Sequence, residues 1–311
     1  MFRQSLFILA LQLAAFVLIG LPVHCPGQDN NELAIGGATL VISFDSEPTP
    51  EFRRLTLEWV TRAADAVSIY YERFPVRLVE ITIHGRSGAA VGPGQASGEG
   101  GPHITMSLGR SVTSRSLTEG GSSWLMTHEM VHLALSGVER NHHWLEEGLA
   151  TYVEPIARVR SGELSAQQVW RDMMEGMPNG QPGSGDRGLD HTPTWGRTYW
   201  GGAMFCLLAD VEIRKKTQNK MGLENALRGI VAAGGTIDTD WGLVRVLATG
   251  DQAIGTPVLE LLYERLKADT SPVDLSALWQ QLGVEERNGS VVFHNDAPLA
   301  SVREAIMSPG Q

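Results

Sequence analysis

The chain has 311 residues, of which 42% are hydrophobic and 19% are charged. It can therefore bury a large core, and it does not have the composition of a disordered chain. Its 25 Lys and Arg against 35 Asp and Glu give a net charge of -10, with no basic cluster. We therefore expect no nucleic-acid partner, because such a surface needs clustered positive charge.

The first 27 residues have the layout of a secretory signal peptide. Arg3 supplies a positive start, residues 5–21 form an apolar run, and the sequence turns polar after it. Cleavage after Gly27 fits the small-residue rule, so we expect a secreted or periplasmic protein. The alternative is a retained membrane anchor, because about 17 apolar residues is near the lower limit for crossing a bilayer.

The two cysteines differ in their expected fate. Cys25 would leave with the signal peptide, so no intramolecular disulfide is expected in the mature chain. Cys206 lies in the apolar run AMFCLLA and is interpreted as a small buried hydrophobic residue.

The segment up to residue 109 predicts a small sheet with one helix. Strands are rich in β-branched residues, and the helix repeats apolar residues at helical spacing. In chain order we expect a mature N-terminal tail (28–37), a strand (38–44), a helix (51–73), a strand (76–84), a Gly-rich loop (85–101) and a strand (103–109).

The rest of the chain predicts mainly helices. A helix over 122–136, capped by Ser122 and Ser123, is apolar on nearly every face and should be buried. Further elements are expected in this order: helix 144–160, loop 176–196, helices near 198–217, 222–233 and 256–268, then a short helix, a strand (290–293) and a helix (298–306). We interpret 38–235 as a catalytic domain and 236–307 as a helical C-terminal part packed on the same unit.

The stretch MTHEMVHLAL (126–135) contains an H-E-x-x-H pattern. Residues four apart share one face of a helix, so His128 and His132 can present two imidazoles to one point. Glu129 is one step round the helix, within reach of a water at that point. The pattern indicates two zinc ligands and a general base.

A catalytic zinc needs a third protein ligand. The metzincin pattern fails, because Ala134 and Val138 stand where it has its Gly and third His. A loop histidine or a glutamate of the next helix could be the third ligand instead. Two glutamates that are adjacent on a helix point about 100° apart, so only one of them can face the metal. The candidates are His142, His143, Glu146 and Glu147.

The segment WLEEGLATY (144–152) resembles the W-L-x-E-G-[FL]-[AT]-x-[YF] segment of gluzincin metallopeptidases. This group includes the catalytic domains of M1-type aminopeptidases and M61-type glycyl aminopeptidases. Its Glu before the Gly is the third zinc ligand, which implies Glu147 here, whereas Glu146 occupies the variable position. The start YWGG (199–202) of the next helix is similar to the family's Tyr helix. This implies that Tyr199 donates a hydrogen bond to the oxyanion, and Arg197 could support an anionic substrate group.

The resemblance implies an α+β fold: a thermolysin-like zincin catalytic domain with a small N-terminal sheet and an α-rich C-terminal half. It also implies a zinc-dependent (Zn²⁺) metallopeptidase acting on a peptide or protein, with the strand 103–109 at the cleft edge. The predicted signal peptide adds the expectation that this enzyme is secreted. The loop between His132 and Glu147 is shorter than in M1 enzymes. The Gly-x-Met-Glu-Asn segment that binds a free α-amino group is missing from that strand, so aminopeptidase specificity is not implied.

A non-catalytic protein that binds a peptide or partner on this scaffold is the alternative hypothesis, and an accidental motif in a structural helix is a third hypothesis.

Overall fold

The computed structural model describes residues 31–308, which belong to one compact unit. The predicted signal peptide (1–27) and Cys25 lie outside the described residues. Within the described part, every helix is too short or too polar to cross a membrane.

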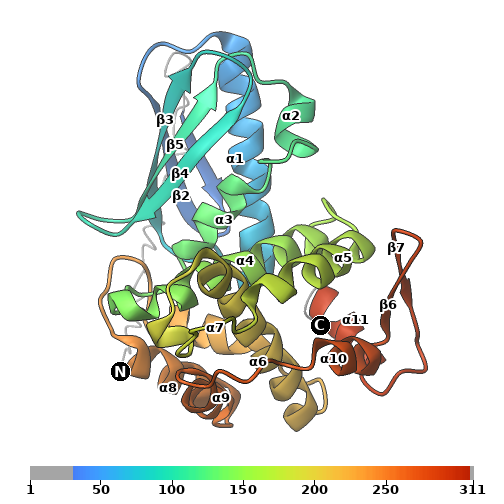
Figure 1. Cartoon of the computed structure of the whole chain (residues 1–311). Helices are drawn as coiled ribbons and strands as arrows, with labels where there is room; N and C mark the ends of the chain where they lie inside the picture. Colours follow the sequence, from blue (N-terminus) through green and yellow to red (C-terminus); the bar gives the residue numbers. More distant parts are fainter. Residues whose placement is uncertain (1–30, 309–311) are drawn as a thin grey trace, which may run out of the picture. The chain divides into compact units, whose positions relative to one another are not determined.

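A five-stranded sheet occupies the N-terminal part of the unit (Figure 1). Its spatial order is β1-β2-β3-β5-β4, with β2, β3 and β5 parallel and the two outer strands antiparallel to their neighbours. Alternate side chains of the inner strands are buried, as expected for a sheet with one covered face. The strands are β1 (Glu32–Ile35), β2 (Ala38–Phe44), β3 (Leu78–Arg86), β4 (Val91–Ser97) and β5 (His103–Gly109).

Helix α1 (Pro50–Tyr71) runs along the sheet (Figure 1). Thr49 caps its N-terminus by accepting a hydrogen bond from the backbone N–H of Phe52, and Pro50 occupies the first turn, where a missing N–H costs nothing. The indole of Trp59 donates to the carbonyl of Ser123 at 3.0 Å. This bond links α1 to the turn that leads into the H-E-x-x-H helix.

Helices form most of the remaining unit, so the described part has a mixed α and β fold with its sheet near the N-terminus. The small hairpin formed by β6 and β7 contains the strand that the sequence predicts near 290–293. The elements are α2 (Ser114–Thr118), α3 (Leu125–His132), α4 (His143–Arg160), α5 (Ala166–Gly176), α6 (Gly202–Thr217), α7 (Leu223–Ala232), α8 (Leu243–Ile254), α9 (Val258–Leu266), α10 (Leu275–Leu282), β6 (Val284–Arg287), β7 (Ser290–Phe293) and α11 (Ala300–Met307).

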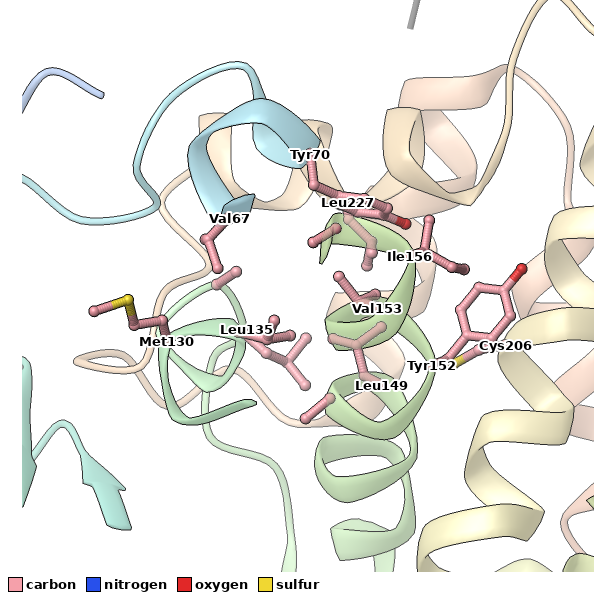
Figure 2. Close-up of a cluster of buried hydrophobic side chains, with 14 of the residues drawn as sticks. Val67, Tyr70, Met130, Leu135, Leu149, Tyr152, Val153, Ile156, Cys206 and Leu227 are labelled. Atoms are coloured by element: carbon pink, nitrogen blue, oxygen red, sulfur yellow. The ribbon is translucent and has the colours of Figure 1, made fainter. Parts of the chain in front are cut away.

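A hydrophobic core joins α3 and α4 to the rest of the unit (Figure 2). Met130 of α3 and Val153 of α4 are fully buried among side chains from α1, α6 and α7. Cys206 belongs to this cluster and is buried, which confirms its interpretation as a small hydrophobic residue. The two helices that carry the motif residues are therefore fixed by packing on their far sides.

Two segments that the sequence suggests as irregular are strands. Part of the expected tail forms β1, and Gly36 and Gly37, both with positive φ, close a two-residue hairpin from β1 to β2. Part of the expected Gly-rich loop forms β4, which pairs with β5 through a register shift between Val91 and Gly94. Glycine and proline give this segment little intrinsic strand preference, so its conformation comes from the pairing.

The expectation that the strand 103–109 borders the cleft is wrong. β5 pairs with β3 on one side and with β4 on the other, so it has no free edge. β4 is one of the two outer strands of the sheet and contacts α3.

Helix α3 is shorter than the predicted 122–136. The residue that caps it is Trp124, and neither Ser122 nor Ser123 caps the helix with its side chain. After His132 the chain tightens into turns, and the carbonyl of Leu133 accepts a hydrogen bond from the N–H of Ile237 at 3.2 Å. The last turn of the expected helix is thus bound to a loop of the C-terminal part.

Candidate metal centre and active site

Helices α3 and α4 bring two imidazoles and one carboxylate together. Glu147 Oε2 lies 3.3 Å from His128 Nε2 and 3.8 Å from His132 Nε2. One ligand atom from each of these three residues lies within 4.8 Å of the others. Trp124 packs its ring edge-on against the His128 imidazole, with centroids 5.1 Å apart, which restricts rotation of that ring.

The three side chains fit a zinc ion. Burial, followed by the neighbouring His128, lowers the pKa of His132 to about 4, so its imidazole is neutral at pH 7 and can act as a ligand. Burial alone would raise the pKa of Glu147, but its hydrogen bond to His128 and the nearby imidazole charges hold that pKa below its ordinary value. Two imidazoles, of which His132 is neutral, and an ionised carboxylate form a donor set typical of catalytic zinc.

Glu129 lies on the side of α3 that faces strand β4. The backbone N–H of Ala96 donates to Glu129 Oε2 at 2.8 Å, which fixes the carboxylate beside the histidines. Gly94 leaves room for it, because a Cβ there would lie 2.9 Å from Glu129 Cγ. Burial raises the pKa of Glu129 above its ordinary value, with the Glu147 charge adding to the effect and His128 and the Ala96 N–H opposing it.

Tyr199 enters the same cleft from a π-helical turn, η4 (Arg197–Gly201), directly before α6. Turns of this kind are frequent at functional sites. Burial, then the charge and hydrogen bonding of Glu147, raise the pKa of Tyr199 to about 12. Its hydroxyl therefore keeps its proton at neutral pH and can act as a hydrogen-bond donor.

Two glycines bring the helices of Glu147 and Tyr199 into close contact. A Cβ at Gly148 would overlap the backbone of Gly202, and a Cβ at Gly202 would lie 2.7 Å from Gly148 Cα. Backbone contact between α4 and the start of α6 therefore requires glycine at both positions. This contact positions Tyr199 next to Glu147.

We expect Gly148→Ala to destabilise the protein by about 1–3 kcal/mol, because the added methyl group must push two backbones apart. Denaturant unfolding followed by circular dichroism measures this change. Gly183→Ala is the matched control, since a Cβ at Gly183 meets no atom within 4 Å. Equal unfolding midpoints for the two variants would contradict the close contact between the helices.

The cleft that contains these residues has a volume of about 500 Å³. Residues 93–98 of β4 and its end form one wall, and α3 and the start of α4 form another. Ile237, from the loop that binds the end of α3, also lines the cleft, although the sequence contains no signal for this role. The C-terminal part thus contributes directly to the site.

Arg197 does not point to a substrate, contrary to the suggestion from the sequence. Its guanidinium is buried, lies 3.0 Å from Asp186 Oδ2 and donates to the carbonyl of Gly180 at 2.6 Å. The residue therefore holds the long loop before η4 in place.

The remaining candidates for the third ligand occupy different positions. His142 lies 3.0 Å from Glu139 Oε2 and 3.5 Å from Asp190 Oδ2, away from the histidine pair. His143 and Glu146 line the cleft and contact each other at 2.8 Å. A hydrogen bond from His143 to Glu146 raises the pKa of the imidazole. From the sequence alone, His143 is only one of several candidates for the third ligand.

No protein-family profile and no curated protein sequence matches the chain. Solved structures do resemble it. An aminopeptidase N family protein from Idiomarina loihiensis matches with a TM-score of 0.59 and 14% identity, over 81% of this chain and 49% of that chain. An M1 zinc metallopeptidase from Deinococcus radiodurans matches with a TM-score of 0.49 and 14% identity, over 78% of this chain and 51% of that chain. The chain spans about half the length of these proteins, and the first match shows that it shares the kind of fold of the Idiomarina loihiensis protein.

Proposed function

We propose that this protein is an exported zinc metallopeptidase of the gluzincin type. The observation that carries the proposal is the convergence of five side chains in one cleft. Two imidazoles and a carboxylate meet at one point, a buried carboxylate faces the same point from α3, and a tyrosine hydroxyl approaches from η4. The aminopeptidase N family fold supports the proposal, and the apolar run at 5–21 supports export.

Each of these residues has a separate role in the proposed reaction. His128, His132 and Glu147 would hold the zinc. When bound there, zinc would supply Lewis-acid chemistry for the scissile carbonyl and would lower the pKa of a water to about 7. Glu129 takes the proton from the attacking water and transfers it to the leaving amine. Tyr199 donates a hydrogen bond where negative charge develops on the carbonyl oxygen.

Strand β4 is the surface on which we expect a peptide to lie. It is one of the two outer strands of the sheet and lines the cleft, and residues 94–98 carry only small side chains apart from Gln95. An extended peptide can add to such an edge through main-chain hydrogen bonds. The N–H of Ala96 already points into the cleft at Glu129, so the outward-facing groups of β4 lie beside the proposed base.

The activity should fall on acidification at a pH above 4.5, the ordinary pKa of a glutamate. Glu129 acts as a base only when ionised, and burial raises its pKa, so protonation removes activity as the pH falls through that raised value. The profile of kcat/KM between pH 4 and 8 measures the effect, and circular dichroism at each pH identifies any acid unfolding. Full activity maintained in folded protein down to pH 4.5 would contradict this role.

Hydrolysis of a mixed peptide substrate by the purified protein tests the proposed function. Cleavage should stop when a chelator removes the metal and should return when zinc is added. A protein that binds zinc but cleaves no peptide would instead support the alternative of a non-catalytic binding protein on the same scaffold.

A further inference from the structure

The two oxygens of Glu147 have different partners. Oε2 faces the imidazole pair, at 3.3 Å from His128 Nε2 and 3.8 Å from His132 Nε2. Oε1 faces the other way and lies 3.4 Å from His143 Nε2. The terminal torsion of a glutamate is broad, so a carboxylate without an outer partner can turn either oxygen toward a metal, or neither.

His143 is placed to restrain this torsion. It is the first residue of α4, and Glu146 and Glu147 follow at the (i, i+3) and (i, i+4) positions, where side chains on a helix are neighbours. Its Nδ1 lies 2.8 Å from Glu146 Oε2 while its Nε2 faces Glu147. One imidazole thus bridges two consecutive carboxylates, and each of its nitrogens has a partner.

We propose that His143 is a positioning residue that fixes Glu147 in the orientation required for zinc binding, with Glu146 fixing His143 in turn. The proposal rests on the proposed zinc site. Groups in contact with the outer side of a metal ligand orient it, and the loss of such partners typically weakens metal binding 10- to 100-fold. His143 is not itself in the ligand group, because the atoms that lie within 4.8 Å of one another come from His128, His132 and Glu147.

The half-exposed position of His143 admits a second interpretation, in which it forms a surface ion pair of little consequence. Its side chain is 52% exposed, and exposed pairs typically contribute less than about 1 kcal/mol. The two interpretations differ in a measurable way. A surface pair affects neither metal affinity nor the ligand geometry, whereas a positioning residue affects both.

Zinc affinity of the full chain, measured by competition with a chromogenic chelator, tests the proposal. His143→Ala should weaken zinc binding 10- to 100-fold while its metal-free melting temperature stays close to that of the wild type. His143→Gln should recover most of the affinity, because its amide N–H can donate to Glu147 Oε1 from nearly the same place. Glu146→Ala should cause a smaller loss than His143→Ala, since the imidazole remains but is held less firmly.

His294→Ala is the matched control. His294 also contacts a glutamate, Glu285, at 2.6 Å and is 43% exposed, but it directly follows β7 and does not line the cleft. The His294→Ala variant should bind zinc as tightly as the wild type does. Wild-type affinity in His143→Ala, or no recovery in His143→Gln, would overturn the positioning role. Absence of zinc binding in the wild-type protein would overturn the proposed function itself.

Discussion

Replacement of Glu129 by Gln should leave zinc binding intact and reduce kcat/KM for peptide hydrolysis by about 10²- to 10⁴-fold. The amide keeps the size of the side chain and can still accept the hydrogen bond from the Ala96 N–H. It cannot take a proton from water, and general-base catalysis typically contributes 10²- to 10⁴-fold. Steady-state kinetics and elemental analysis of the same preparation measure the two quantities.

Glu99→Gln provides the control for this substitution. Glu99 is an exposed carboxylate that follows the end of β4, so the change alters the charge near the cleft in the same way without touching the proposed base. Its kinetics should match those of the wild type. Cleavage by Glu129→Gln at the wild-type rate would disprove the assignment of the general base.

The second large effect is expected at Arg214 in α6. Its guanidinium donates to Asp210 at 2.7 Å and to Glu224 of α7 at 2.8 Å, and all three side chains are buried. Arg214→Ala would leave two buried carboxylates without this cation, which should lower the free energy of unfolding by about 3–5 kcal/mol. Urea unfolding of the metal-free protein measures the change.

Lys215→Ala is the adjacent control. Lys215 lies 2.6 Å from Glu212, but both side chains are more than 40% exposed, so the loss should be at most about 1 kcal/mol. Equal unfolding midpoints for the two variants would show that the buried Arg214 cluster stabilises the protein no more than an exposed ion pair does.

This buried cluster also supports the site. The hydroxyl of Tyr152 in α4 donates to Asp210 at 3.0 Å, so the helix that carries Glu147 is bound to the helix that follows Tyr199. Together with the contact between Gly148 and Gly202, the cluster fixes the two helices relative to each other. Loss of Arg214 should therefore reduce zinc affinity as well as stability.

The residues of the candidate site can be predicted from the sequence because each of them belongs to a short, recognisable sequence pattern. The spacing of His128, Glu129 and His132 places them on one turn of a helix, and the structure shows that turn. Glu147 and Tyr199 come from the resemblance of short segments to a known family, and the structure brings both into the same cleft. Their chemical roles stay predictions until they are measured.

The surroundings of the site depend on contacts between distant segments. β4 contains glycine and proline and becomes a strand only because it pairs with β5, so its sequence favours a loop. Ile237 reaches the cleft because its N–H binds the carbonyl of Leu133, more than 100 residues earlier. His143 looks like part of a solvated loop until helix α4 places it one turn before Glu147.

The helices that lie outside the predicted elements include α5 and α8. Both are amphipathic, with Val169, Trp170 and Met173 of α5 and Val246 and Leu247 of α8 buried. Ser165 caps α5 by accepting from the N–H of Gln168, a signal that is readable in the sequence. α8 follows a glycine with positive φ, Gly242, and has no side-chain cap, so its start has no local marker.

We propose that two histidines and one glutamate of this chain hold a catalytic zinc. Elemental analysis combined with X-ray absorption spectroscopy of the purified protein tests it most directly. We predict one zinc per chain with two imidazole nitrogens at about 2.0–2.1 Å and oxygen ligands at about 2.0–2.2 Å, and loss of this metal in Glu147→Ala. A protein that contains no zinc after zinc loading, or whose zinc stays in the same coordination in Glu147→Ala, would contradict the account.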